Sequence, residues 1–149
     1  MIEIKGKRGY VVKYRITEYE EMLKVKEKYE KLFKVRGYNV IYFSTNEDIL
    51  EYDNKLFKMS GLAGRISYEK NVVMVNEYSL NQIVDTLIHE YVHLLLRFIY
   101  PYNSSNHLKV FRLIYSALSF KEGIEPSHYQ EIWNKKHTLF PKFILRDKH

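Results

Sequence analysis

The sequence predicts an α+β fold with a small, mostly antiparallel sheet and several helices. Two segments open with capping boxes and continue with apolar residues at helical spacing. Between them lie short runs rich in β-branched and aromatic residues, two of which are only three residues apart, as in a hairpin. The 149 residues show no internal repeat, low-complexity segment or linker. We therefore expect residues 1–149 to form a single domain.

Several elements are expected before that hairpin. Residues 10–16 are rich in β-formers and partly alternate, which favours a first strand. Residues 17–20 form a capping box, and the helix that follows should end at Gly37. Residues 38–43 predict another strand. Residues 46–60 are polar and mixed, and they predict irregular or briefly helical structure.

From residue 79 onward the chain is expected to be helical. The predicted hairpin joins residues 62–68 to residues 72–76. Residues 79–82 are a second capping box, and their helix should run to about Tyr100, because Pro101 stops it. The remaining expectations are a third helix from Ser104 or Ser105, a fourth after Pro126 and a short basic tail from Phe140.

Composition limits the cofactors and the location of the protein. There is no cysteine, so any metal must be held by His, Asp, Glu or water, and neither a disulfide nor a cysteine zinc ribbon is expected. The chain begins without an apolar signal-peptide core. Its most apolar stretch, residues 94–100, is interrupted by Arg97 and too short to cross a bilayer. We therefore expect a cytoplasmic protein without a membrane segment.

The net charge of +6 favours polyanionic partners such as DNA, through long-range attraction and counterion release. The alternative is an ordinary solvated face. The lysines between Lys24 and Lys34 alternate with glutamates along the first predicted helix, as on such a face.

His89 and His93 stand four residues apart in the helix that residues 79–82 open. This spacing stacks both imidazoles on one helix face, one turn apart, where they can hold one zinc ion. Glu90 can reach a water on that zinc, act as general base and pass the proton to the leaving amine of a peptide bond. The H-E-x-x-H pattern thus predicts a zinc metallopeptidase. The alternative is two partly buried histidines beside a solvated glutamate.

A third protein ligand is required, because catalytic zinc keeps one position open for water. Leu96 and Ile99 occupy the positions of the glycine and the histidine of a metzincin, which excludes that class. His107 is the best candidate, since a helical hairpin around Pro101 could bring it beside His93; an exposed histidine at a helix start is the alternative. Glu122 and Glu125 are the fallback ligands, and His128, His137 and His149 are expected at the surface.

Substrate contacts are expected from a strand edge. An extended peptide can pair with an exposed edge over the active helix, and the strand with Gly64, Arg65 and Ile66 is the candidate, because Gly64 allows close backbone approach. A purely structural hairpin is the alternative. Asp85, one turn before His89, could orient an imidazole or lie on the helix surface. Candidate donors to the oxyanion are Tyr100, Tyr102, Arg112 and Tyr115.

Residues 19–118 resemble the SprT-like zinc metallopeptidases, which include the Spartan-type proteases that cut proteins crosslinked to DNA. The resemblance rests on a helix followed by the segments GLAGRISY, VVMVN, TLIHEYVH and HLKVF, which begin at residues 61, 72, 86 and 107. It implies a minimal zincin-like domain: a small, mostly antiparallel sheet on the active-site helix, with further helices.

The sequence departs from that family at two points. Leu108 stands where a glycine commonly follows the third histidine. Many relatives carry a cysteine zinc ribbon or a long DNA-binding tail after the protease domain, and this chain shows neither.

Two other functions stay open from the residues alone. One is a glutamate-type mini-zincin peptidase with Glu122 or Glu125 as third ligand. The other is a basic nucleic-acid-binding module with a non-catalytic zinc site, which the 14 tyrosines and the positive charge permit. Either peptidase would take a protein or peptide substrate.

Overall fold

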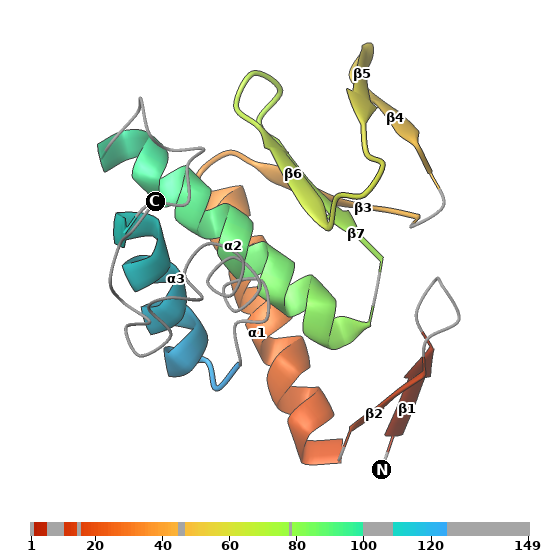
Figure 1. Cartoon of the computed structure of the whole chain (residues 1–149), viewed down its shortest axis with the longest axis vertical. Coiled ribbons are helices and arrows are strands. Elements are labelled where there is room, and N and C mark those ends of the chain that lie inside the picture. Colours follow the sequence, from red (N-terminus) through yellow and green to blue (C-terminus); the bar gives the residue numbers. More distant parts are fainter. Residues whose placement is uncertain are drawn as a thin grey trace, which may run out of the picture. The chain divides into compact units, whose positions relative to one another are not determined.

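The computed structural model describes residues 2–5, 11–14, 16–44, 47–77, 79–99 and 109–124 (Figure 1). The chain divides into two compact units, Met1–Glu90 and Tyr91–His149, and the boundary falls inside one helix. The expectation of a single domain over residues 1–149 stays a prediction. Within the described segments, no helix combines the length and the apolarity that crossing a membrane requires.

The first unit begins with an antiparallel pair, β1 (Ile2–Lys5) and β2 (Val11–Tyr14). The strand expected over residues 10–16 is therefore confirmed as β2, whereas β1 was not anticipated. Helix α1 (Ile16–Val35) starts one residue before Thr17. The expected cap residue thus lies in the first turn, and the predicted start is wrong by about one position.

Helix α1 ends as predicted, because Gly37 has a φ of 84° that suits glycine. The Tyr38 amide donates to the Phe33 carbonyl, and the Gly37 amide donates to the Lys34 carbonyl, both at 2.9 Å. This pair of bonds is a Schellman motif, and it turns the chain directly into β3.

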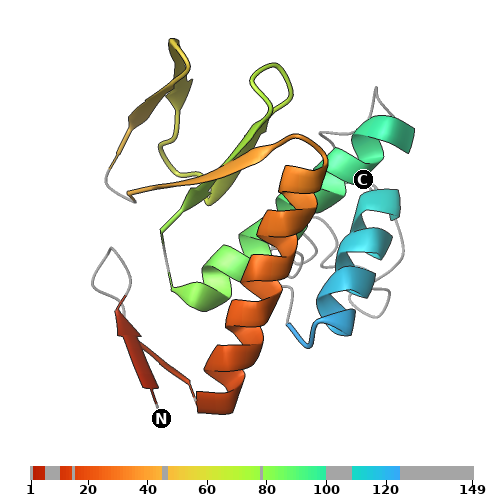
Figure 2. The same ribbon diagram turned by 180° about the vertical axis from the view of Figure 1, so that it is seen from behind.

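The central sheet has three strands, β3 (Asn39–Phe43), β7 (Val72–Asn76) and β6 (Gly64–Ser67), in the order β3-β7-β6. Strand β7 pairs antiparallel with β6, as the predicted hairpin requires, and parallel with β3. All five residues of β7 are buried, which explains its continuous apolar run. Helix α1 contacts β3 (Figure 2).

A second hairpin, β4 (Ile49–Tyr52) and β5 (Lys55–Lys58), occupies the segment for which irregular or helical structure was expected. That prediction is wrong. Asp53 and Asn54 both have positive φ and form the tight two-residue turn that suits a hairpin. The hairpin buries apolar side chains against the central sheet, in a cluster made of Phe43, Phe57, Met59, Val72 and Met74.

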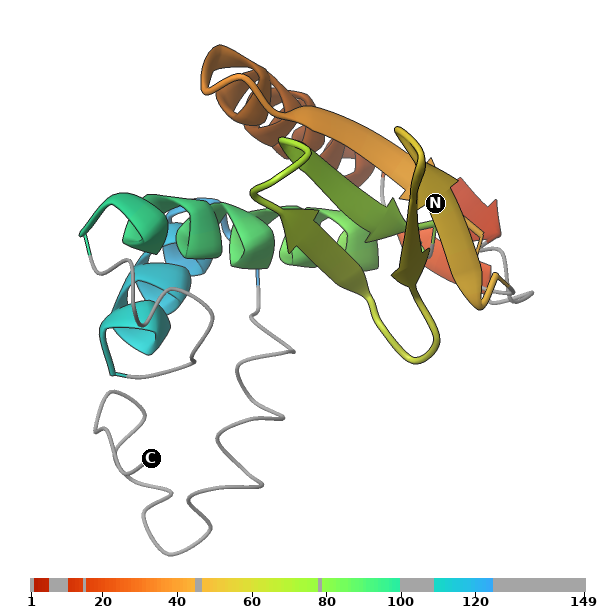
Figure 3. The same cartoon turned by 90° about the horizontal axis from the view of Figure 1, so that it is seen from above.

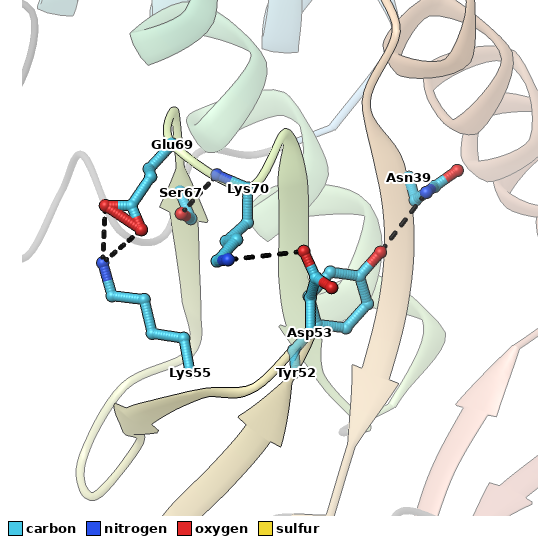
Figure 4. Close-up of polar contacts among 7 residues, drawn as sticks. All are labelled: Asn39, Tyr52, Asp53, Lys55, Ser67, Glu69 and Lys70. Atoms are coloured by element: carbon cyan, nitrogen blue, oxygen red, sulfur yellow. Dashed lines mark hydrogen bonds and ion pairs between the residues drawn. The ribbon is translucent and has the colours of Figure 1, made fainter.

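The tip of this hairpin lies beside the β6–β7 turn (Figures 3 and 4). Lys55 Nζ contacts both carboxylate oxygens of Glu69 at 3.2 Å, and Lys70 Nζ lies 3.4 Å from Asp53 Oδ2. All four side chains are at least partly exposed, so these pairs contribute little stability. The apolar cluster therefore holds the hairpin.

Helix α2 (Leu80–Ile99) begins where its capping box predicts, since the Ile83 amide donates to the Ser79 carbonyl at 3.0 Å. In the second unit, α3 (Lys109–Lys121) ends at Gly123, with a φ of 73°. The predicted turn after Pro101, the exact start of the third helix, the fourth helix and the basic tail lie outside the described residues. The α+β class with mostly antiparallel strand pairs is confirmed.

Candidate metal centre

Helix α2 buries three polar side chains in an otherwise apolar segment. His89, Glu90 and His93 are 8%, 6% and 7% exposed, and the neighbouring Ile88, Val92 and Leu94 are fully buried. Because α2 is one continuous helix, the two imidazoles lie one turn apart on the same face. The alternative of a solvated glutamate beside them does not hold, since Glu90 is buried with them.

The carboxyl group of Glu90 lies against β6. A Cβ atom placed on Gly64 would be 3.2 Å from Glu90 Oε2 and 2.4 Å from Thr86 Cγ2. Glycine at position 64 is therefore what lets the strand pass this close to α2.

Burial raises the pKa of the Glu90 carboxyl to about 8. A nearby cation would favour the charged form of this carboxyl instead.

Strand β6 is an edge strand among the segments that the structure describes. The Asn76 amide donates to the Ala63 carbonyl, so residues 63 and 76 form a hydrogen-bonded pair. In an antiparallel ladder such pairs alternate. The backbone groups of Arg65 consequently face Met74 in β7, and those of Gly64 and Ile66 point to the open edge.

Arg65 reaches the other face of the sheet. Its Nη1 donates to the Lys58 carbonyl at 3.1 Å, and its guanidinium carbon lies 5.2 Å from the centre of the Phe57 ring. The three residues expected at the substrate edge therefore differ. The backbone groups of Gly64 and Ile66 lie on the side of β6 away from β7, whereas Arg65 connects β6 to the β4–β5 hairpin.

The imidazole of His93 packs on α3 within the second unit. Its ring centroid lies 4.5 Å from that of Phe111, at an interplanar angle of 41°, and Phe111 contacts Tyr115 at 5.8 Å. A ring held in this way has few orientations available, which favours a fixed ligand geometry.

Most of the candidates for the third ligand lie outside the described residues. His107 and Glu125 lie outside them, as do His128, His137 and His149. Glu122 lies in the turn after α3 and is partly exposed. In the segments that are described, no group of three His, Cys, Asp or Glu residues could hold a metal ion.

The supporting residues have mixed outcomes. Asp85 is buried rather than on the helix surface. Of the candidate donors to the oxyanion, Arg112 and Tyr115 are fully buried in α3, and Tyr100 and Tyr102 lie outside the described residues.

The donor set on α2 suits zinc. Two imidazole nitrogens match the histidine ligands of catalytic zinc sites, and the nearby carboxyl group matches a general base beside such a site, with no cysteine thiolate in the chain. Burial of all three side chains also provides the low-dielectric surroundings in which a metal acts strongly on a substrate. The residues present therefore fit a zinc ion.

Sequence reasoning missed Thr86 and Asn76. Thr86 is the side chain that lies closest to the position a Cβ on Gly64 would take. Asn76 ends the otherwise apolar strand VVMVN and is only 3% exposed. A lone amide at the end of a buried strand was the signal available for it, since buried amides need hydrogen-bond partners.

Comparison with known proteins adds one finding. A family model, that of the SprT-like family, matches residues 30–130, more than half of the chain. The match spans the central sheet, α2 and α3, and it includes His107. No curated protein and no solved structure matches the chain.

Proposed function

The chain belongs to the SprT-like family, and from this membership we propose that it is a zinc-dependent metallopeptidase that hydrolyses peptide bonds. One observation carries the proposal: α2 buries two imidazoles one turn apart, and the Glu90 carboxyl of the same helix lies against strand β6.

In this proposal His89 and His93 hold zinc through their ring nitrogens, and His107 completes the set. Zinc, when bound, supplies Lewis-acid polarisation of the scissile carbonyl and lowers the pKa of a water molecule. Asp85, one turn before His89 and buried, can accept the other ring N–H of a histidine and so fix its orientation.

Glu90 acts as the general base. Its carboxylate takes a proton from the attacking water and then donates it to the leaving amine, as one positioned carboxyl group can do for both steps. Its contact with β6 at Gly64 supports this role, because a peptide paired with that strand edge would bring its backbone close to the carboxyl.

The substrate class follows from the edge of β6. The backbone groups of Gly64 and Ile66 can pair with a peptide in extended conformation, as in recognition by strand addition. Main-chain hydrogen bonds tolerate many side chains, so we expect unfolded or locally extended protein segments to be cleaved in preference to compact folded ones.

The test is Glu90→Gln in the zinc-loaded protein, with an unfolded protein as substrate. We expect cleavage to fall by at least about 100-fold, the order that general-base catalysis contributes, with the zinc content unchanged because the ligands remain. Glu51→Gln is the matched control, since Glu51 is exposed on the β4–β5 hairpin. It should cleave like the wild type.

Wild-type rates in Glu90→Gln would show that Glu90 is not the base. If the wild-type protein neither retains zinc nor cleaves any unfolded substrate, the peptidase proposal is wrong as a whole.

A further inference from the structure

Asn76 is a buried amide at the end of the central strand. It is 3% exposed, and the other four residues of β7 are valine or methionine with no exposed surface. Burying a carboxamide costs free energy unless its groups form hydrogen bonds. The hydrogen bonds of the Asn76 side chain therefore decide what this buried amide contributes.

The amide holds the chain that enters β6. The backbone N–H of Asn76 donates to the Ala63 carbonyl at 2.8 Å, and its side-chain Nδ2 donates to the Leu62 carbonyl at 3.1 Å. Two consecutive carbonyls are thus bound by one residue. We call this pair of bonds the Asn76 latch.

Only the donor side of the carboxamide is used. Among the described residues, the buried Oδ1 of Asn76 has no hydrogen-bond partner. An unsatisfied buried carbonyl costs free energy. If packing alone mattered, an apolar side chain at this position would therefore make the fold more stable than asparagine does. The donor to Leu62 is what an apolar side chain lacks.

Gly64 directly follows Ala63, and a side chain at position 64 would have little room. A Cβ there would meet Thr86 Cγ2 at 2.4 Å and both Glu90 Oε2 and the Met74 carbonyl at 3.2 Å. Little more than the space of one methyl group therefore separates the backbone of β6 from the Glu90 carboxyl, and a small displacement of residues 62–64 would alter that spacing.

We propose that Asn76 is a positioning residue whose latch sets the distance between β6 and the Glu90 carboxyl. At this distance the edge at Gly64 and Ile66 can receive an extended peptide. The inference rests on the proposed peptidase function for its kinetic consequence. Its structural part, the control of β6 by Asn76, is independent of that function.

The experiment uses the full chain with two substitutions. Asn76→Leu keeps the approximate size and removes the donor, and it also removes the unsatisfied Oδ1, so the protein should still fold. Asn76→Asp keeps the shape and replaces the donor with an acceptor that faces the Leu62 carbonyl. Asn39→Asp is the matched control, because Asn39 is an exposed asparagine on β3 whose Nδ2 donates to Tyr52 Oη at 3.3 Å.

The first readout is amide hydrogen exchange, with or without zinc. The amides of Arg65 and Ser67 face β7 and report on the position of β6. We expect their exchange to accelerate by at least about tenfold in both Asn76 variants, as for a locally loosened strand. Amides of α1 and the thermal midpoint of Asn76→Leu should stay at wild-type values. A general packing role for Asn76 would instead lower that midpoint.

The second readout is steady-state cleavage of an unfolded protein by the zinc-loaded enzyme. Pairing with a strand edge is present in the bound substrate and in the transition state alike, so we expect KM to rise by about tenfold and kcat to change by less than about threefold. Asn39→Asp should leave exchange and both kinetic constants unchanged.

Wild-type exchange at Arg65 and Ser67 in both Asn76 variants would overturn the proposal, whatever the activity. Faster exchange with an unchanged KM would overturn the link between the latch and substrate pairing. Faster exchange in a protein whose wild type cleaves nothing would leave the latch supported and would count against the peptidase function alone.

Discussion

Gly64 shows how the absence of a side chain brings a strand and a helix together. The strand passes so close to Thr86 and Glu90 that a single methyl group has no room. Interiors are packed as densely as organic crystals, so such a methyl group must displace backbone or side chains.

Gly64→Ala should therefore affect both stability and cleavage. We expect a loss of about 1–3 kcal/mol in the free energy of unfolding, as for overpacked sites, and a fall in cleavage of at least about tenfold, because even small displacements at an active site are costly. Chemical denaturation and the rate of peptide cleavage measure the two effects.

A second substitution supplies the control. Thr86→Ser removes the Cγ2 atom that lies 2.4 Å from the added methyl group, so the double variant Gly64→Ala/Thr86→Ser should regain part of the stability that Gly64→Ala loses. Strict additivity of the two single effects would show that the methyl group and Thr86 do not meet.

The third zinc ligand is also a question about single residues. We expect His107→Ala to lower zinc affinity sharply, and Glu122→Ala and Glu125→Ala to retain zinc, because nitrogen donors complete a three-histidine site. Zinc content after dialysis against a weak chelator measures this. Loss of zinc in either glutamate variant, with retention in His107→Ala, would instead support the glutamate-type site.

At the level of elements, α1 is fastened to β3 by a polar group of three side chains. Tyr42 Oη donates to Glu30 Oε2, and Lys26 Nζ lies 3.2 Å from the same oxygen. The ammonium group also stands 5.1 Å from the centre of the Tyr42 ring. Burial, the hydrogen bond to Glu30 and the charge of Glu30 raise the pKa of Tyr42 well above its ordinary value of 10.0.

Tyr42→Phe should lower the free energy of unfolding by about 1.5–3 kcal/mol, the range for hydrogen bonds to charged groups. A group whose pKa is raised by folding stabilises below its unfolded pKa, and that contribution declines as the pH rises above about 10. The difference between wild type and Tyr42→Phe should thus be full at neutral pH and shrink in alkali. Denaturant unfolding at pH 7, 9 and 10.5 measures it.

Tyr52→Phe is the matched control for this prediction. The Tyr52 hydroxyl accepts an exposed hydrogen bond from Asn39 Nδ2 at 3.3 Å. The substitution should therefore lower the free energy of unfolding by less than about 0.5 kcal/mol, as surface substitutions usually do. Equal losses in the two variants would mean that the contact with Glu30 adds nothing.

For the whole molecule, the net charge of +6 bears on partners rather than on the fold. The exposed face of α1 carries side chains of both positive and negative charge. Lys24 Nζ, for example, lies 4.0 Å from Glu21 Oε1, and both side chains are largely exposed. The charge is thus not concentrated in one purely basic stripe on that helix.

We expect weak binding to nucleic acid that depends strongly on salt. If the protein neutralises a few phosphates, its affinity should fall by at least about tenfold when the salt concentration rises from 50 to 200 mM. Fluorescence anisotropy with single-stranded DNA measures this, and heparin should compete because the interaction would lack sequence specificity. Tight binding that salt does not weaken would point to a dedicated nucleic-acid site instead.

The sequence by itself determined the elements whose signals are local. The second capping box predicted the start of α2, and Gly37 predicted the end of α1, because these signals act within one or two helical turns. The position of His89, Glu90 and His93 on one helix followed in the same way. Strand β7 was predicted at its true bounds, since a buried strand is continuously apolar.

Only the tertiary structure decided how those elements meet. The β4–β5 hairpin lacks a strong apolar alternation. It is stabilised by burial of Phe57 and Met59 against strands of the central sheet that precede and follow it in the sequence. The parallel pairing of β3 with β7 depends on register between strands distant in sequence. The passage of Gly64 beside Glu90 and the Asn76 latch depend on tertiary packing and on a side-chain hydrogen bond. Register between strands that no tight turn connects is decided by which side chains pack across the sheet, and that packing exists only in the folded chain.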